Sequence, residues 1–368
     1  MKTTNIARFL LFAWVIAGFA LLGGCATNRG PVAVSGPANI SLVRELISQG
    51  IEYGDRGDHD RAIEIFTEAI SLNPNYFEAY YYRGNAYVEL GEFNRAIEDY
   101  SHAIRLNPNS ADAYNNRGGA YFEIGEFNRA IADFSQAIRL NPNYAEAYYN
   151  RGVGYGELGE FNRAIADYSQ AIRLNPNYFE AYHNRGNAYV KFGEFNRAIE
   201  DYSHAIRLDP NYAEPYHGRG NAYVNLRDLN RAIADYSQAI RLNPNHFDAY
   251  NNRGNAYVEL GELNRAIEDF NDAIRLNPNS AVAYFNRGVA YDELDDFSRA
   301  IEDYSHAISL DPYDYMPYVN RGLMYAILGD FNRAIADWEQ LLRLNNVPEA
   351  IRAQIRQLIE AARQELRR

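Results

Sequence analysis

Cysteine is almost absent from the sequence, since Cys25 is the only one among 368 residues. A disulfide framework within one chain is therefore impossible, and a zinc site with several thiolate ligands is excluded. Lysine is nearly as scarce, because Lys2 and Lys191 are the only two among 36 basic residues. All the others are arginines, which suit planar, bidentate pairing with carboxylates. Many of the arginines are therefore expected to have structural roles.

Sequence motifs of common enzymes are also missing. The chain contains no phosphate-binding G-x-x-x-x-G-K-[ST], no G-x-S-x-G and no H-E-x-x-H. The net charge of −12 argues against sequence-independent binding to nucleic acid, which requires a basic surface. We therefore expect a protein that is not an enzyme, has no cofactor and no metal site, and acts by binding other proteins.

The first 24 residues have the pattern of an export signal. Lys2 and Arg8 precede an apolar stretch, residues 9–22, that is too short to span a membrane comfortably. The stretch leads into Leu22-Gly23-Gly24-Cys25, which resembles the lipobox of bacterial lipoproteins. The resemblance implies cleavage before Cys25 and lipidation of its sulfur and new amino terminus. An ordinary secretory signal and an uncleaved anchor are the alternatives.

The residues that follow Cys25 bear on where such a lipoprotein resides. Ala26, rather than Asp, stands next to the cysteine. By the usual sorting rule of Gram-negative lipoproteins, Ala26 implies the outer membrane, facing the periplasm. Residues 25–40 contain glycine and proline and no apolar period, so they are predicted to be a flexible tether.

A spacing of 34 residues runs through the rest of the chain. It relates nine glycines, nine tyrosines that begin with Tyr53, and nine alanines that begin with Ala62; the glycines are Gly50, Gly84, Gly118, Gly152, Gly186, Gly220, Gly254, Gly288 and Gly322. Three sets of residues that keep the same 34-residue spacing over most of the chain indicate tandem repeats. The predicted copies are 43–76, 77–110, 111–144, 145–178, 179–212, 213–246, 247–280, 281–314 and 315–348.

Each copy is predicted to form two helices. In the second copy, apolar residues recur with the helical period over 79–90 and over 93–104. Gly84 is expected to let the two helices approach closely, and Gly91 to take positive φ and end the first helix. Pro108 ends the second helix, and Asn109 is expected to cap the next.

The repeated positions resemble a known family. In the second copy they are Tyr80, Arg83, Gly84, Tyr87, Ala96, Tyr100, Ala103 and Pro108. This pattern, over roughly 43–348, resembles the tetratricopeptide repeat (TPR). The resemblance implies an all-α fold, a right-handed α-solenoid (superhelix) of nine TPR helical hairpins. Residues 349–368, with an apolar stripe, are predicted to be a C-terminal capping helix.

One position departs from the family pattern. The apolar residue expected before the repeated glycine is arginine in eight copies, and an unpaired buried charge costs several kcal/mol. The second helix supplies an aspartate in the same eight copies. We therefore predict a ladder of ion pairs within copies, beginning with Arg83–Asp99, Arg117–Asp133 and Arg151–Asp167. Arg95, four residues before Asp99, is the competing partner.

The family resemblance also implies that the first helices line a concave groove that receives an extended peptide. An amide side chain can pair with any peptide unit, and the predicted peptide-binding residues are mostly asparagines. We call residues at the same position of successive copies a column. One column comprises Asn116, Asn150, Asn184, Asn252, Asn286 and Asn320, and a second comprises Asn85, Asn187, Asn221 and Asn255. The first column resembles the asparagine ladder of a known TPR domain. A merely solvated face is the alternative.

Two further columns define the character of this groove. Tyr81 and Tyr149 are expected to be exposed for stacking, and a column of glutamates that begins with Glu89 makes the groove acidic. An extended partner with aromatic and basic groups is therefore predicted. Glycan binding and self-association of the repeats are the alternatives. His183 and His217 share a column that holds no acid, so no metal site is predicted there.

Overall fold

The computed structural model describes residues 37–368. The predicted signal peptide, Cys25 and the tether as far as residue 36 lie outside the described residues. The predicted tether extends to residue 40, but α1 already begins at Pro37. A helix tolerates proline in its first turn, and the Asn39 amide donates to the Leu72 carbonyl at 3.1 Å, which ties the start of α1 to the end of α2.

Residues 37–368 form only helices, nineteen in number. They are α1 (Pro37–Asp55), α2 (His59–Leu72), α3 (Phe77–Glu89), α4 (Phe93–Leu106), α5 (Ala111–Glu123), α6 (Phe127–Leu140), α7 (Ala145–Glu157), α8 (Phe161–Leu174), α9 (Phe179–Lys191), α10 (Phe195–Leu208), α11 (Ala213–Asn225), α12 (Leu229–Leu242), α13 (Phe247–Glu259), α14 (Leu263–Leu276), α15 (Ala281–Asp292), α16 (Phe297–Leu310), α17 (Met316–Ile327), α18 (Phe331–Arg343) and α19 (Glu349–Glu365).

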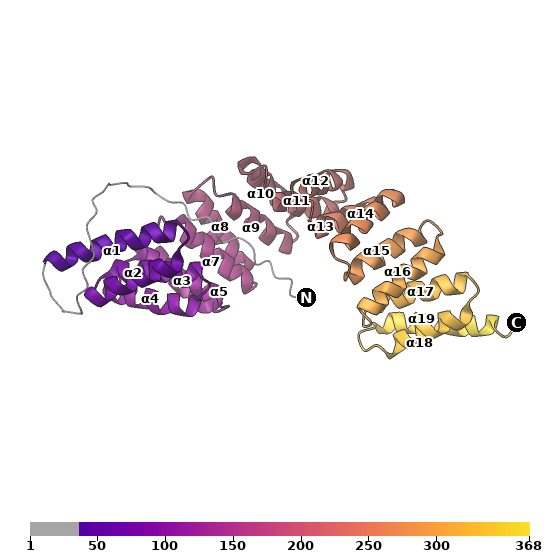
Figure 1. The fold of residues 1–368 in the computed structure, drawn as a ribbon. Helices are drawn as coiled ribbons and strands as arrows, with labels where there is room; N and C mark the ends of the chain where they lie inside the picture. The colour runs from indigo at the N-terminus through magenta and orange to yellow at the C-terminus, as the bar shows by residue number, and fades with distance from the viewer. Residues whose placement is uncertain (1–36) are drawn as a thin grey trace.

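The helices pair into nine hairpins that stack in chain order from α1 to α18, with α19 against the last (Figure 1). Each hairpin contacts the next, and successive odd-numbered helices also touch, as α9 does with α11 and α11 with α13. This places the odd-numbered helices on the inner side of the curved stack. The predicted all-α solenoid is confirmed. None of the described helices combines the length and apolar character that a membrane crossing requires.

Small residues set the distance between the helices of a hairpin. A methyl group added at Gly84 would lie 2.8 Å from the Tyr100 ring, so only glycine fits there. The same clash exists at Gly186 with Tyr202. Gly91 has a φ of 73°, as predicted for the end of α3.

The predicted cap at Asn109 is wrong. Ser110 is the N-cap of α5, and its hydroxyl accepts from the Ala113 N–H at 3.2 Å. Asn109 is instead held in the preceding turn, where its N–H donates to the side chain of Asn107 at 3.2 Å. Asparagine side chains readily form such turns with the nearby backbone. Because Asn109 belongs to this turn, α5 begins one residue later than predicted, after Ser110.

The C-terminal helix covers the open end of the last hairpin. Ile355, Ile359 and Ala362 are at most 4% exposed and pack in one cluster with Trp338 and Leu341 of α18. The predicted apolar stripe is therefore largely buried, except that Leu366 follows the helix and is exposed. The last hairpin obtains from α19 the apolar partner that every other hairpin obtains from its neighbour.

Candidate functional site

The arginine before each repeated glycine is paired with the aspartate of its own copy. Arg83 donates from Nε to Asp99 Oδ2 at 2.7 Å and from Nη2 to Asp99 Oδ1 at 2.8 Å. The Asp99 side chain is 6% exposed. The same bidentate geometry recurs in the seven later copies, so the predicted ladder is present; its pairs are Arg83–Asp99, Arg117–Asp133, Arg151–Asp167, Arg185–Asp201, Arg219–Asp235, Arg253–Asp269, Arg287–Asp303 and Arg321–Asp337.

Each guanidinium also reaches back to the preceding copy, a contact that the sequence did not indicate. Nη1 of Arg117 donates to the Ser101 hydroxyl at 3.0 Å, and Nη1 of Arg151 donates to the Ser135 hydroxyl at 3.1 Å. Burial alone would lower the pKa of Arg117, but the hydrogen bonds and charge of Asp133 more than offset it, so the pKa is raised. The arginines therefore stay charged and join consecutive copies.

Arg95, the competing partner of Asp99, has a different role. It pairs with Glu92 and lies over the Tyr87 ring, with 4.0 Å between the guanidinium carbon and the ring centroid. The pair with Glu92 is exposed on both sides, and exposed pairs contribute little to stability. The buried ladder and this surface row are thus separate networks.

The first asparagine column links neighbouring copies on the inner side. Asn150 Nδ2 donates to Asn115 Oδ1 at 3.2 Å, and Asn184 Nδ2 donates to the Tyr149 hydroxyl at 2.9 Å. The other members do the same toward the copy before them: Asn116 to Tyr81 and Asn85, Asn252 to Asn221 and the His217 ring, Asn286 to Asn251, and Asn320 to Tyr304. The amide nitrogens of this column are therefore engaged between copies.

The amide oxygens of the same column are disposed differently. Oδ1 of Asn150, Asn184 and Asn252 has no hydrogen-bond partner among the described residues and is not among their buried unpaired atoms. These oxygens are therefore partly accessible acceptors on α7, α9 and α13, with Gly218 in the corresponding place on α11. A ligand that uses them must donate hydrogen bonds, as the N–H groups of an extended peptide do.

The second asparagine column is divided between two environments. Asn85, Asn187 and Asn221 each accept a 2.7 Å hydrogen bond from a tyrosine hydroxyl of the second helix, namely Tyr100, Tyr202 and Tyr236. For Asn255 the residue at the corresponding position of the second helix is Phe270, which has no hydroxyl to donate. Three of the four predicted binding residues therefore also fix the hairpin, which the column alone did not reveal.

The aromatic residues predicted for stacking are less exposed than expected. Tyr149 is buried, at 6% exposure, among the rings of Tyr168 and Tyr178. The prediction that Tyr149 is exposed for ligand stacking is wrong, because the Tyr168 and Tyr178 rings of its own copy pack against it. Tyr81 is half-buried, and burial raises its pKa to about 12. The glutamates that begin with Glu89 are exposed, as are their exceptions Lys191 and Asn225.

In the middle of the stack, the column that contains Tyr81 and Tyr149 holds His183 and His217 instead of tyrosine. Burial lowers the pKa of His183 and of His217 to about 4, while the charge of Glu214 opposes the shift in both. The His246 ring lies 4.7 Å from the His217 ring, between centroids, and is 8% exposed. The sequence argument against a metal site considered only the column of His183 and His217, so it missed Glu214 and His246 from neighbouring positions.

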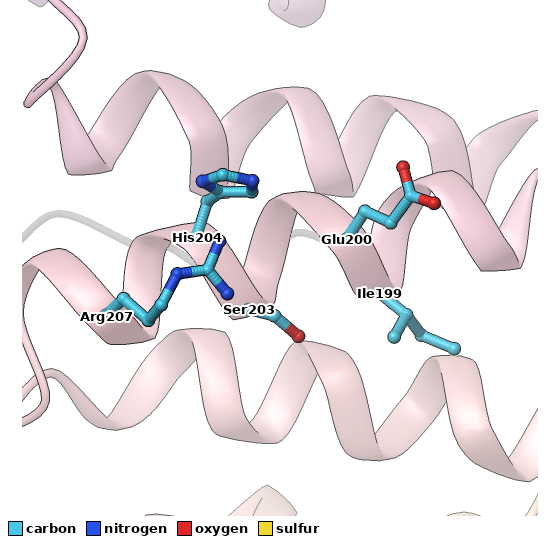
Figure 2. Close-up of a pocket in the computed structure, with 5 residues that line it drawn as sticks. All are labelled: Ile199, Glu200, Ser203, His204 and Arg207. Atoms are coloured by element: carbon cyan, nitrogen blue, oxygen red, sulfur yellow. The ribbon is translucent and has the colours of Figure 1, made fainter.

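Figure 2 shows a shallow hollow on the surface, and reactive side chains from different helices do not converge in it. Its lining residues are Ile199, Glu200, Ser203, His204 and Arg207, all from α10. The Ser203 hydroxyl is already committed, since it accepts from Arg219 at 2.9 Å. A hollow lined by one helix face does not surround a substrate, and we assign it no catalytic role.

The fold and these networks define the chain as a solenoid repeat protein. Models of the TPR and tetratricopeptide repeat families match most of it, at residues 50–91, 84–125, 118–159, 154–193, 186–226, 228–261, 254–295, 281–314 and 317–348. The chain belongs to the tetratricopeptide repeat family. Its fold is that of a protein–protein interaction scaffold.

Individual relatives resemble parts of the chain. The uncharacterized protein MJ0572 of Methanocaldococcus jannaschii is 40% identical over 43 residues, which are 12% of this chain and half of that protein. The crystal structure of MamA is 34% identical and covers 44% of this chain and 94% of its own, with a TM-score of 0.42. The Cut9–Hcn1 structure is 20% identical over 76% of this chain and 55% of its own, with a TM-score of 0.53, and shows the same fold.

Proposed function

We propose that the protein is a non-catalytic scaffold of the bacterial envelope, held at the outer membrane by lipid on Cys25, and that it binds extended segments of other proteins along its odd-numbered helices. The observation that supports binding is the row of accessible Oδ1 acceptors on Asn150, Asn184 and Asn252, whose amide nitrogens are held by the preceding copy. An acceptor held in place loses little freedom when a peptide N–H donates to it.

Such a row favours extended segments with little sequence selectivity. Backbone N–H groups are common to every peptide, so acceptors alone do not select a sequence. Selection comes from the exposed glutamates that begin with Glu89 and from the net charge of −12, which favour a basic partner. The partner is therefore an extended, positively charged protein segment that donates its backbone hydrogen bonds to the asparagines.

The groove is tested by removing its acceptors. Residues 26–368 carrying Asn150→Ala, Asn184→Ala and Asn252→Ala are expected to lose envelope proteins that the unmodified chain retains, while circular dichroism shows unchanged helicity. The control carries alanine at Asn128, Asn162 and Asn196, which are exposed on the even-numbered helices. Equal binding by both triple variants would place the partner surface away from the asparagine row.

The anchor is tested separately at Cys25. Cys25→Ser removes the only thiol of the chain, so we expect the protein to move from the membrane fraction to the soluble fraction of the envelope after processing. Mass spectrometry of the mature amino terminus of the unmodified protein should show acyl chains on Cys25. An unmodified amino terminus, or unchanged fractionation of the serine variant, contradicts the lipid anchor and leaves the groove test unaffected.

A further inference from the structure

Three side chains that can bind metal meet on the inner side of the stack. Glu214 and His217 lie three residues apart on α11, so they project from the same face of that helix. His246 is the N-cap residue of α13, the next inner helix, which touches α11 (Figure 1). One ligand atom from each residue lies within 4.8 Å of the other two. The three residues belong to one copy, 213–246, in which Glu214 and His217 open the first helix and His246 ends the copy.

The spacing of these atoms suits a small divalent ion. Nε2 of His246 lies 3.6 Å from Oε2 of Glu214, beyond a normal hydrogen bond. Two ligands bound to one zinc ion at about 2.0–2.1 Å with tetrahedral angles are about 3.4 Å apart. A shift of a few tenths of an ångström in this pair therefore suffices for both to bind the same ion.

The polar atoms around Glu214 are incompletely paired without such an ion. Within residues 39–368, two buried side-chain nitrogens or oxygens lack any hydrogen-bond partner, namely Nδ1 of His183 and Nε2 of His246. Nε2 of His246 faces Glu214, and His246 is 8% exposed. Buried polar atoms are almost always paired, so the orphan at His246 points to a missing partner.

The set is peculiar to one place in the repeat. The equivalent positions of the preceding copy hold Glu180, His183 and Tyr212, and those of the following copy hold Asp248, Asn251 and Ser280. Only the combination at 214, 217 and 246 supplies a carboxylate and two imidazoles. Repeat duplication does not account for it, because the neighbouring copies lack it.

We propose that Glu214, His217 and His246 bind a late first-row divalent transition metal ion such as Zn²⁺. Two imidazoles and one carboxylate are a typical donor set for this ion, with a fourth position left for water or a ligand. The ion joins α11 to the start of α13 and places a positive charge on the inner surface of an acidic protein. This proposal does not depend on peptide binding by the asparagines.

The surrounding residues hold the two imidazole rings. Nε2 of His217 lies 3.1 Å from Nδ2 of Asn252 in the following copy, and since an amide nitrogen donates, Nε2 accepts and the neutral ring carries its proton on Nδ1. An ion bound at Nε2 displaces this hydrogen bond, and an ion bound at Nδ1 displaces the ring proton. Nδ1 of His246 accepts a long hydrogen bond, 3.4 Å, from the Ala249 N–H, which places the ring proton on Nε2. When a metal binds at Nε2, that proton moves to Nδ1, so binding gives up one long hydrogen bond.

The test uses the purified full chain, freed of metal with a chelator and titrated with Zn²⁺ in a calorimeter. We expect one saturable site per chain, and a Zn²⁺-dependent rise in melting temperature because the ion binds only the folded arrangement. His246→Tyr places there the residue found at Tyr144, Tyr178 and Tyr212 in other copies. We expect this variant to bind at least about tenfold more weakly.

A second variant and a control separate ligand loss from misfolding. His217→Asn introduces the residue present at Asn115 and Asn251 and should also lose the site, while His204→Asn, at an exposed histidine of α10, should bind as the unmodified protein does. Co²⁺ should give the absorption of a four-coordinate site in the unmodified protein and in His204→Asn, and not in His246→Tyr or His217→Asn. Equal Zn²⁺ affinity in all four proteins, or no saturation by the unmodified one, overturns the proposal.

Discussion

Replacing Asp167 with alanine is expected to lower the free energy of unfolding by about 3–5 kcal/mol, because it leaves the Arg151 guanidinium buried without its carboxylate. Arg151 holds both oxygens of Asp167, with its Nε 2.7 Å from Oδ2. The two side chains are 20% and 9% exposed, so water can replace the lost partner only in part. Urea denaturation followed by circular dichroism measures the loss, and hydrogen exchange should place it in the copies around α7 and α8.

Two comparisons decide whether the burial of the pair is the cause. Glu160→Ala breaks the exposed pair with Arg163, in which the side chains are 41% and 65% exposed, and should cost less than about 1 kcal/mol. A double variant, Arg151→Met with Asp167→Leu, removes both charges and should cost less than Asp167→Ala alone. Equal losses for Asp167→Ala and Glu160→Ala would contradict a structural role for the ladder.

The ladder also shows what a sequence with internal repeats can predict. The period of 34 residues established the hairpins, and the joint absence of arginine and aspartate from the first copy, where Gln49 and Ile65 stand, indicated pairing within a copy. The period and the joint absence are both found by comparing equivalent positions of the copies, which requires only the sequence. The bond from Arg117 to Ser101 was missed because serine is common on exposed helix faces and has no distinctive signal there.

The inner surface was less predictable for a different reason. A column says which helix face a residue occupies, but not which side chains of other columns pack against it, and the rings of Tyr168 and Tyr178 decided the burial of Tyr149. The metal-binding candidate required residues from different columns, since Glu214, His217 and His246 meet only after two helices are placed. The spacing Glu-x-x-His at 214–217 was the one signal in the sequence, and alone it is weak.

Removing residues 349–368 is expected to expose the end of the stack and to cause self-association. Ile355 and Ile359 are 2% and 4% exposed, and a fully buried isoleucine contributes about 1.5–3 kcal/mol. Arg352 also donates to the Leu342 carbonyl at 2.7 Å, which satisfies the end of α18. Without α19, the apolar surface around Trp338 and Leu341 resembles the interface that every other hairpin covers with its neighbour.

The truncated protein should therefore elute earlier from a size-exclusion column as its concentration rises, and its last hairpin should lose protection from hydrogen exchange. Removing only Leu366–Arg368, which are exposed, should change neither property. A third variant, Ile355→Ser with Ile359→Ser, keeps the chain length and should behave as the truncation does. If the truncated protein elutes as a monomer at every concentration while its helicity is retained, α19 is not the element that prevents end-to-end stacking, and the last hairpin must be stable with its apolar face open.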